Sequence, residues 1–582
     1  MRRLYLKYQI RLNIFKNVII FLFTFILIKF FFIQVIGRSS YKKLISDKTV
    51  TYKHNKGYRG NIYDRNNNLL AYSTKKCIFW VDTYSTNDSD ISKIINLFSN
   101  EFESQKSKYK ILLNKKSKYL VIERDLIAYY HKNLINKAKQ ISSLRIEYYN
   151  HRLYPYNELA AQVIGFTDYE NQGKYGIEGY FNNILSGSES MVEYNKTASG
   201  KTLLDQNNTS LPTNGSDIFL TIDVKIQEIL QNQLKQALII NQAKSANGII
   251  MNPYNGEIIA MASLPDFNLN SYKNLPSDSA HYHYINRVIS SAYEPGSTFK
   301  IICFISAVDK NINSSLEKYF CEKGLYTGKY IKPFKDHDGG YDSLTFNEIF
   351  SNSSNIGTIK IFQDLSKDFF YDKIKKFGFG IKSNISLKDE HKGEIQPFNY
   401  YKNNLRDLAS ISIGQSILVT NLQMALAYCS IANGGYLLKP KIIKKINHNY
   451  YTEEFNTPKV LYKNMKKSTS KTILMLLQKT VEEGTAKKSY IKELEIGGKT
   501  GTAEIWNLES KNYSKKEFFA SFASVFPIDN PKYVMIISIE APDYNKRWAA
   551  ESAVPCAKNI IQDIMFYDTQ IINKQDKNNE EA

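Results

Sequence analysis

One long apolar run near the amino terminus constrains this chain more than any other feature. Residues 18–36 read VIIFLFTFILIKFFFIQVI, a 19-residue stretch with a single charge at Lys29. A helix of about 20 apolar residues crosses a bilayer, and the rest of the 582 residues holds no second run of that length. Five basic residues and no acidic one precede the run, as is typical of a cytoplasmic flank. We predict a cytoplasmic stub at 1–17, a membrane anchor at 18–36 and an extracytoplasmic remainder.

Two aspects of this run have alternative interpretations. A cleaved signal peptide is the alternative to an anchor, but signal peptides have apolar cores of only ~7–15 residues, so we favour the anchor. A charge inside a bilayer costs on the order of 3 kcal/mol. Lys29 avoids that cost either by extending its amine to the interface, which is the simpler interpretation, or by a polar contact with a partner membrane helix.

The composition excludes several function classes. The chain has 77 Lys and Arg residues against 56 Asp and Glu residues, a formal net charge of +21. Such a charge suits nucleic acid, anionic lipid or anionic polymers, but Lys is abundant along the whole chain, so a solvated basic surface is the simplest interpretation. An extracytoplasmic domain does not meet nucleic acid, so no nucleic-acid partner is expected. The five cysteines form no Cys-x-x-Cys pair, which predicts no metal, no cofactor and no disulfide framework.

A polar linker divides the part that follows the anchor. Residues 205–217 read DQNNTSLPTNGSD, a turn-rich stretch that places a domain boundary between 215 and 216. Upstream, 37–215 contains strand-like pieces without a catalytic constellation, which indicates a spacer or docking module. Downstream, 216–566 forms the larger domain, and 567–582 is a polar tail.

The larger domain is predicted to be of the α+β class. An Asn-Gly turn at 255–256 closes a β-hairpin over 248–261. Further segments alternate like strands, at 496–504, 517–526 and 533–540. Other segments have the apolar spacing of helices, at 224–239, 298–309, 420–433 and 553–565. The hairpin and the late strands are expected to share one antiparallel sheet that is covered by helices.

The strongest chemical signal lies at the start of the helix predicted at 298–309. The preceding residues turn at Pro295-Gly296, and Ser297 and Lys300 lie one helical turn apart. Burial disfavours the charged form of lysine, and a neutral lysine can take the proton of a serine nucleophile. Other Ser-x-x-Lys pairs occur in the chain, among them Ser39/Lys42, Ser107/Lys110, Ser468/Lys471 and Ser489/Lys492, so this spacing is specific only together with the turn and the apolar helix.

Two further motifs follow in order along the chain. Ser353-Ser354-Asn355 begins 56 residues after Ser297, and Lys499-Thr500-Gly501-Thr502 begins 146 residues after Ser353, on a predicted strand. Glycine in a strand permits close approach of another backbone, and a lysine offers a cation to a carboxylate. The three motifs in this order, behind a membrane anchor, are far more specific than any one of them.

This order resembles that of the class B, monofunctional penicillin-binding proteins. The resemblance extends over nearly the whole chain and includes further segments, at 59–66, 176–178, 220–223, 261–265 and 286–287. It implies a non-catalytic, elongated pedestal of the dimerisation type at 37–215. It also implies a penicillin-binding transpeptidase domain at 216–566 with a fold like that of serine β-lactamases. Residues 522–531 are more similar to the septal, division-specific members than to the elongation-specific ones.

The chain departs from the family pattern at two places on the expected cleft rim. Gly414-Gln415-Ser416 contains fewer glycines than expected before Thr420, and Glu504 stands where glutamine is common. Neither departure affects the expected nucleophile.

The resemblance implies a serine acyl-enzyme reaction on the D-Ala-D-Ala end of peptidoglycan stem peptides, with β-lactams as mimics of that end. The catalytic residues implied are Ser297, Lys300, Ser353, Asn355 and Lys499. Thr500, Gly501 and Thr502 would bind the substrate, and the backbone N–H groups of Ser297 and Thr502 would form the oxyanion hole. His337 and Glu294 are expected to be structural, because this scheme needs no imidazole and no further acid.

The implied setting is a single-pass protein of the bacterial inner membrane, with its catalytic domain in the periplasm. A SEDS-family glycan polymerase and other division proteins are the implied partners. An elongation-specific transpeptidase is the nearest alternative. A β-lactamase is disfavoured by the Ser-Ser-Asn motif and the pedestal, and a non-enzymatic division scaffold is disfavoured by the intact motif set.

Overall fold

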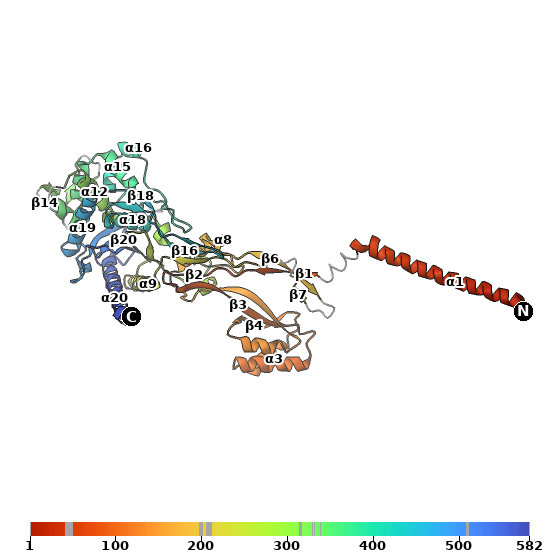
Figure 1. Cartoon of the computed structure of the whole chain (residues 1–582). Coiled ribbons are helices and arrows are strands. Elements are labelled where there is room, and N and C mark those ends of the chain that lie inside the picture. The colour runs from red at the N-terminus through yellow and green to blue at the C-terminus, as the bar shows by residue number, and fades with distance from the viewer. Residues whose placement is uncertain are drawn as a thin grey trace. The chain divides into compact units, whose positions relative to one another are not determined.

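The computed structural model describes residues 2–40, 50–196, 202–204, 212–313, 317–328, 330, 332–337, 339–507 and 511–580. It forms two compact units (Figure 1). The first comprises Met1–Tyr58 and Gly187–Asn214, and the second comprises Arg59–Ser186 and Gly215–Ala582.

The first unit begins with a long helix. α1 (Arg2–Phe31) continues directly into the π-helical turn η1 (Phe32–Ile36). The stretch Tyr5–Ile36 is long and apolar enough to cross a membrane, and its side chains are exposed. The anchor predicted from the sequence is therefore the carboxyl-terminal part of one continuous helix.

A small antiparallel sheet completes the first unit. β6 (Glu189–Lys196) pairs with β1 (Val50–Lys56) on one side and with β7 (Thr202–Leu204) on the other. Residues 205–211 of the predicted polar linker lie outside the described residues.

A seven-stranded sheet runs through the first part of the second unit. Its strand order is β17-β16-β8-β2-β3-β4, and β5 pairs with β3. The strands are β2 (Ile62–Tyr63), β3 (Leu69–Val81), β4 (Leu120–Ile127), β5 (Leu144–Leu153), β8 (Asp217–Leu220), β16 (Ile443–Asn447) and β17 (Thr452–Glu454). Segments on both sides of the boundary predicted at 215/216 thus contribute to one sheet.

Helices cover one face of β3, β4 and β5. They are α3 (Asp88–Glu101), α4 (Lys106–Leu113) and α5 (Lys132–Ala138). Their apolar side chains form a separate core with the strands, in which Phe98 of α3 packs edge-on against Phe79 of β3. Short helices follow at α6 (Ala161–Ile164), α7 (Gly176–Tyr180) and α8 (Asn182–Leu185).

A buried ion cluster joins three of these segments. The Glu178 carboxylate of α7 receives Nε of Arg59 at 2.5 Å and Nε of Arg152 at 2.6 Å. All three side chains are at most 5% exposed. Burial alone would raise the pKa of Glu178, but the two guanidinium groups outweigh burial and lower it. The pairing explains why the 59–66 and 176–178 segments occur together in the sequence pattern.

The predicted antiparallel sheet forms the centre of the catalytic part. Its order is β10-β9-β21-β20-β19. The strands are β9 (Ser245–Met251), β10 (Ile258–Leu264), β19 (Gly497–Asn507), β20 (Asn512–Phe526) and β21 (Tyr533–Glu540). The early hairpin and the late strands therefore share one sheet, and the predicted α+β class is confirmed. β19 lies at the edge of this sheet.

Helices pack against the sheet (Figure 1), and buried apolar side chains form one layer on each of its faces. On one face lie α9 (Val224–Ile240) and α20 (Ala553–Glu580), and on the other lie α12 (Lys300–Asp309), α18 (Asn421–Ala432) and α19 (Lys467–Glu482). Successive strand residues such as Met535 and Ile536 enter opposite layers, so both faces of the sheet are buried. α20 is longer than the helix predicted at 553–565.

Shorter elements surround the cleft and connect these layers. The helices are η2 (Leu269–Asn274), α10 (Ala280–Tyr284), α11 (Arg287–Ser290), η3 (Gly296–Phe299), η4 (Glu322–Gly324), α13 (Phe346–Ser351), α14 (Asn355–Gln363), α15 (Lys367–Lys376), α16 (Phe398–Asn403), α17 (Leu405–Ser412), η5 (Lys487–Ser489) and η6 (Tyr544–Lys546). The strands are β11 (Lys318–Phe320), β12 (Leu325–Tyr326), β13 (Phe334–Lys335), β14 (Ser343–Thr345), β15 (Tyr436–Leu438) and β18 (Val460–Lys463).

Candidate active site

Ser297 lies in a tight turn just before a helix, and the regular helix begins two residues later than position 298, where the sequence predicts its start. The 3-10 turn η3 precedes α12, which begins at Lys300. Gly296 has φ +54°, and its N–H donates to the Gly414 carbonyl at 3.0 Å. A Cβ at Gly296 would lie 3.0 Å from the Thr502 carbonyl oxygen. The turn is therefore held between the edge strand β19 and the 414 loop, and only glycine fits there.

Two lysine side chains converge on Ser353 from different elements. Lys300 Nζ donates to the Ser353 carbonyl and, at 3.2 Å, to its Oγ. Lys499 Nζ, on β19, donates to the same Oγ at 2.9 Å. Because both amines donate, the hydrogen of the Ser353 hydroxyl is left to point elsewhere. Ser353 has φ +60°, a left-handed conformation that non-glycine residues rarely adopt and that is frequent at functional sites.

Both lysine side chains are fully buried, and this changes their proton affinity. Burial lowers the pKa of Lys300 to about 7, although the negative charge of Asp336 partly opposes that shift. Burial also lowers the pKa of Lys499 well below its usual value, and the charge of Lys300 adds to the effect. A neutral lysine at neutral pH is the form that can accept a proton.

The Lys-Thr-Gly strand presents its two threonines to the cleft. Thr500 Oγ1 lies 2.7 Å from Thr485 Oγ1, and Thr502 Oγ1 accepts the Ala549 N–H at 3.1 Å. A Cβ at Gly501 would lie 2.6 Å from the Pro295 carbonyl oxygen. The close approach that the glycine predicts is thus made by the nucleophile turn of the chain itself.

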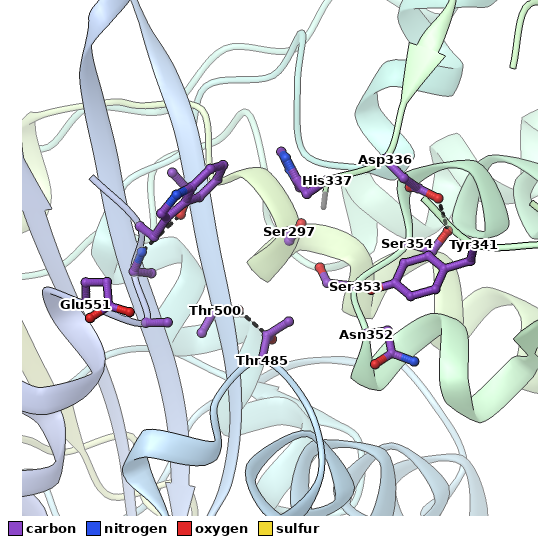
Figure 2. A pocket seen from close by; sticks show the side chains of 14 residues that line it. Ser297, Asp336, His337, Tyr341, Asn352, Ser353, Ser354, Thr485, Thr500 and Glu551 are labelled. Carbon is purple, nitrogen blue, oxygen red and sulfur yellow. Dashed lines mark hydrogen bonds between the residues drawn. The ribbon is translucent and has the colours of Figure 1, made fainter. Parts of the chain in front are cut away.

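These elements border a cleft with a cavity volume of about 310 Å³. Of the sequence-predicted residues, the cleft is lined by Ser297, Ser353, Thr500 and Thr502. Figure 2 shows the hydroxyl groups of Ser297 and Ser353 facing the same space, between His337 on one side and Thr485 and Thr500 on the other. Lys300 and Lys499 are buried behind the cleft wall, and each donates a hydrogen bond to the Ser353 hydroxyl oxygen, which lines the cleft.

One contact expected from the Ser297–Lys300 spacing is not made by the described residues, and the implied catalytic side chain of Asn355 has a partner outside the cleft motifs. The Ser297 hydroxyl has no hydrogen bond to Lys300 among the contacts of these two described side chains. The Asn355 amide donates to the Lys335 carbonyl at 2.8 Å and does not contact Lys300. The structure brings the motif residues to one cleft, but the sequence spacing did not determine these side-chain directions.

The sequence motifs did not predict several of the residues that line the cleft. Asp336, Thr485, Trp548 and Glu551 line the cleft, and the His337 ring lies edge-on to the Trp548 indole with ring centroids 5.1 Å apart. None of these residues belongs to a motif, and each reaches the cleft through a loop that is remote in sequence. Within the described ranges, no group of three or more His, Cys, Asp or Glu side chains could hold a metal ion.

Glu294 fixes loops, as expected. Its carboxylate accepts the Ser416 N–H at 2.7 Å and the Tyr513 hydroxyl at 2.9 Å. Burial raises the pKa of Glu294, these hydrogen bonds oppose the shift, and the negative charge of Glu504 adds to it. The two departures from the family pattern, at 414–416 and at Glu504, therefore meet at this carboxylate.

A family model described as the penicillin binding protein transpeptidase domain matches residues 247–562. The chain belongs to the penicillin-binding proteins. A second model, the penicillin-binding protein dimerisation domain, matches residues 54–220. The family resemblance inferred from the three motifs is confirmed, and the protein is a penicillin-binding transpeptidase.

Similar proteins extend this finding along most of the chain. Stage V sporulation protein D of Bacillus subtilis is 31% identical over 517 residues, which cover 87% of this chain and 77% of that protein. Peptidoglycan D,D-transpeptidase FtsI of Buchnera aphidicola subsp. Schizaphis graminum is 28% identical over 562 residues, covering 94% and 93%. The solved structure of Penicillin Binding Protein 2X from Streptococcus thermophilus aligns with a TM-score of 0.75 at 22% identity, covering 88% and 80%, and shows the same fold.

Proposed function

We propose that this penicillin-binding protein is a septal peptidoglycan D,D-transpeptidase that acts through an acyl-enzyme at Ser297. The observation that carries the proposal is the hydrogen-bonded group of Lys300, Ser353 and Lys499, which borders the same cleft as the Ser297 hydroxyl. A nucleophile beside a buried, neutral amine and a relaying hydroxyl is the arrangement that acyl transfer by serine requires.

In the proposed acylation step, Ser297 Oγ attacks the carbonyl of the penultimate D-Ala. The Ser297 proton passes to neutral Lys300, and a proton then reaches the departing D-Ala nitrogen through the Ser353 hydroxyl. The C–N bond breaks, an ester forms between Ser297 Oγ and the carbonyl carbon, and D-Ala leaves with a neutral amino group that carries the relayed proton. Hydrogen bonds that are long or absent in a free enzyme commonly tighten when substrate binds, so the Ser297–Lys300 contact is expected to form in the complex.

The proposed oxyanion hole consists of the backbone N–H groups of Ser297 and Thr502. Its support is the close approach of the η3 turn to β19, which brings these two backbone segments side by side. Preorganised N–H donors of this kind are worth 10²–10³-fold in rate. Thr500 and Thr502 would bind the terminal carboxylate with Lys499 contributing charge, and the Asn355 side chain would hold the substrate amide.

An amine from a second stem peptide is proposed to attack the ester, releasing Ser297 and forming the crosslink. Two relatives named for peptidoglycan D,D-transpeptidation support this outcome over hydrolysis. The septal assignment rests on the same FtsI names and on residues 522–531, and an elongation role is the alternative.

The proposed location is the bacterial inner membrane, with 1–17 in the cytoplasm, 18–36 as the anchor and the domains at 37–215 and 216–566 in the periplasm. The apolar stretch Tyr5–Ile36 and the basic residues before the anchor support this topology. A SEDS-family glycan polymerase and other division proteins are the proposed partners of the anchor and the pedestal.

The decisive experiment is labelling of the full chain by a fluorescent penicillin. Ser297→Ala is expected to abolish labelling. Ser468→Ala is the matched control, because Ser468 and Lys471 have the same spacing on the exposed start of α19 and should not affect labelling. Labelling that persists in Ser297→Ala would refute the nucleophile.

Two further measurements separate the alternatives. The purified protein should open one equivalent of nitrocefin and then stop, whereas a β-lactamase would continue. A tagged copy in dividing cells should concentrate at midcell, and distribution along the lateral wall would instead support the elongation role.

A further inference from the structure

Asp336 is a half-buried residue whose carboxylate lines the cleft but has no role in the proposed mechanism. Its side chain accepts the Ser354 hydroxyl at 2.8 Å, the Asn355 N–H, and the Ile356 N–H at 3.1 Å. The contact with Ser354 is drawn in Figure 2. Asp336 follows β13, whereas the other residues start α14, so Asp336 caps this helix from a separate loop.

The turn that Asp336 holds contains Ser353. Ser353 has the left-handed φ of +60° and directly precedes the groups that bind Asp336. A left-handed non-glycine residue persists only when its surroundings fix it. The carboxylate therefore restrains the conformation in which Ser353 offers its carbonyl and hydroxyl oxygens to Lys300 and its hydroxyl oxygen to Lys499.

The titratable groups around Lys300 come from three elements. Lys499 faces it from β19, the neutral thiol of Cys303 faces it from α12, and Asp336 faces it from the end of β13. Among the described groups that act on Lys300, Asp336 is the one carboxylate. Burial disfavours a proton on Lys300, and the charge of Asp336 favours one.

We propose that Asp336 is a positioning residue of the transpeptidation site, which holds the Ser353 turn in place through its hydrogen bonds to Ser354, Asn355 and Ile356 and supplies a negative charge that acts on Lys300. The proposal rests on the assignment of Lys300 as the base for Ser297. It adds to the three sequence motifs a fourth element that reaches the site from the loop after β13.

The test is the pH dependence of acylation by a fluorescent penicillin, measured on the full chain for the wild type and for Asp336→Asn. Asparagine keeps an oxygen acceptor for the α14 N–H groups and removes the charge. Lys300 then loses its proton at lower pH, so the acid limb of the rate profile moves to lower pH. We expect the rate at pH 6, relative to the plateau, to rise about threefold or more, since one pKa unit is tenfold.

Two variants separate the charge from the helix cap. Asp336→Glu keeps the charge but displaces the carboxylate, so the plateau rate should fall while the acid limb stays near its wild-type position. Glu348→Gln is the matched control, because Glu348 caps the adjacent helix α13 by accepting the Thr345 N–H at 2.9 Å and does not act on Lys300. Its profile should keep the wild-type position.

The proposal is overturned if Asp336→Asn slows acylation equally at every pH, because the carboxylate is then only a cap, or if rate and profile both stay unchanged. If Asp336→Asn does not fold, Asp336→Ser takes its place with the same expected shift, because serine is a good helix cap. Failure of the proposed function is distinct, because the wild-type protein would then not be labelled at Ser297.

Discussion

Two regions of the second unit bury ionisable side chains. One region holds them in ion pairs, and the other does not. In the pedestal, the Glu178 carboxylate is enclosed by Arg59 and Arg152 at 2.5 and 2.6 Å. In the cleft, Lys300 and Lys499 are equally buried but form no ion pair with a described carboxylate, and they meet at the Ser353 hydroxyl. A fully paired buried charge fixes structure, whereas an unpaired one with an altered pKa marks a place where protons move.

The two regions also respond differently to burial. For Glu178, burial opposes ionisation, but the arginines overcome it and the pKa falls. For Lys300, burial is the dominant influence, and the pKa of the amine falls to about 7. The Glu178 carboxylate therefore keeps its charge at any physiological pH, whereas the Lys300 amine changes its charge near neutral pH.

Removal of Lys300, the proposed base, should have the largest effect. Lys300→Met is expected to lower the rate of penicillin acylation by about 10²–10⁴-fold, the usual contribution of a general base. The free energy of unfolding should not fall, because an apolar chain replaces a buried amine without an ion pair. Labelling kinetics at pH 8 and urea unfolding measure the two quantities. Lys310→Met, at the exposed end of α12, is the control, and normal acylation by Lys300→Met would mean that another base acts.

Removal of the Glu178 charge should have the opposite pattern of effects, on stability and not on acylation. Glu178→Gln leaves two buried guanidinium groups short of a carboxylate, so the free energy of unfolding should fall by about 3–5 kcal/mol. The acylation rate of the molecules that remain folded should stay unchanged. Glu170→Gln, an exposed carboxylate nearby, should affect neither quantity. If acylation by folded Glu178→Gln falls tenfold, the separation between the two regions is wrong.

The pH dependence sharpens the comparison further. Lys300 must be neutral to act, so with a pKa of about 7 acylation at pH 6 should be about tenfold slower than on the plateau above pH 8. The pKa of this lysine is lower in the folded than in the unfolded protein, so the native state gains stability as the pH rises from about 7 toward 10.5. The stability difference between Lys300→Met and the wild type should therefore shrink over that range. A flat rate profile between pH 6 and 8 would contradict the assignment.

The smallest expected effect concerns a neutral pair at the cleft wall. Thr485→Val removes the hydroxyl that lies 2.7 Å from Thr500 Oγ1, and one hydrogen bond is worth about 1 kcal/mol. Acylation should slow about fivefold. Thr480→Val is the matched control, because the Thr480 hydroxyl donates to the Leu476 carbonyl inside α19 and does not line the cleft. Equal rates for both variants would show that Thr485 does not orient Thr500.

The sequence predicted the parts of the molecule that depend on neighbours along the chain. The helix α9 and the hairpin of β9 and β10 follow from apolar spacing and local turn chemistry, and the three motif segments are read directly from the sequence. The shared sheet also followed, because apolar strands need neighbouring strands to pair with and helices to cover their apolar faces.

Long-range contacts explain what could not be predicted. The 3-10 turn at Ser297 depends on the Gly414 carbonyl, more than 100 residues away. Asp336 and Thr485 reach the site through tertiary packing, and no local pattern marks either of them. The direction of the Asn355 amide was not predictable for the same reason, because the Lys335 carbonyl that binds it belongs to another loop.

The pairing of β19 with β20 has a consequence for how the chain can vary. From Gly497 to Glu504 the two strands keep one unbroken register, and the shift occurs only between Glu504 and Trp506. A slip of one residue in a strand exchanges its two faces, which would turn Thr500 and Thr502 away from the cleft. The irregularity lies beyond Thr502, on the side of the hairpin tip. Insertions or deletions at the tip can therefore be absorbed at this bulge, and the threonines stay aligned with the nucleophile turn.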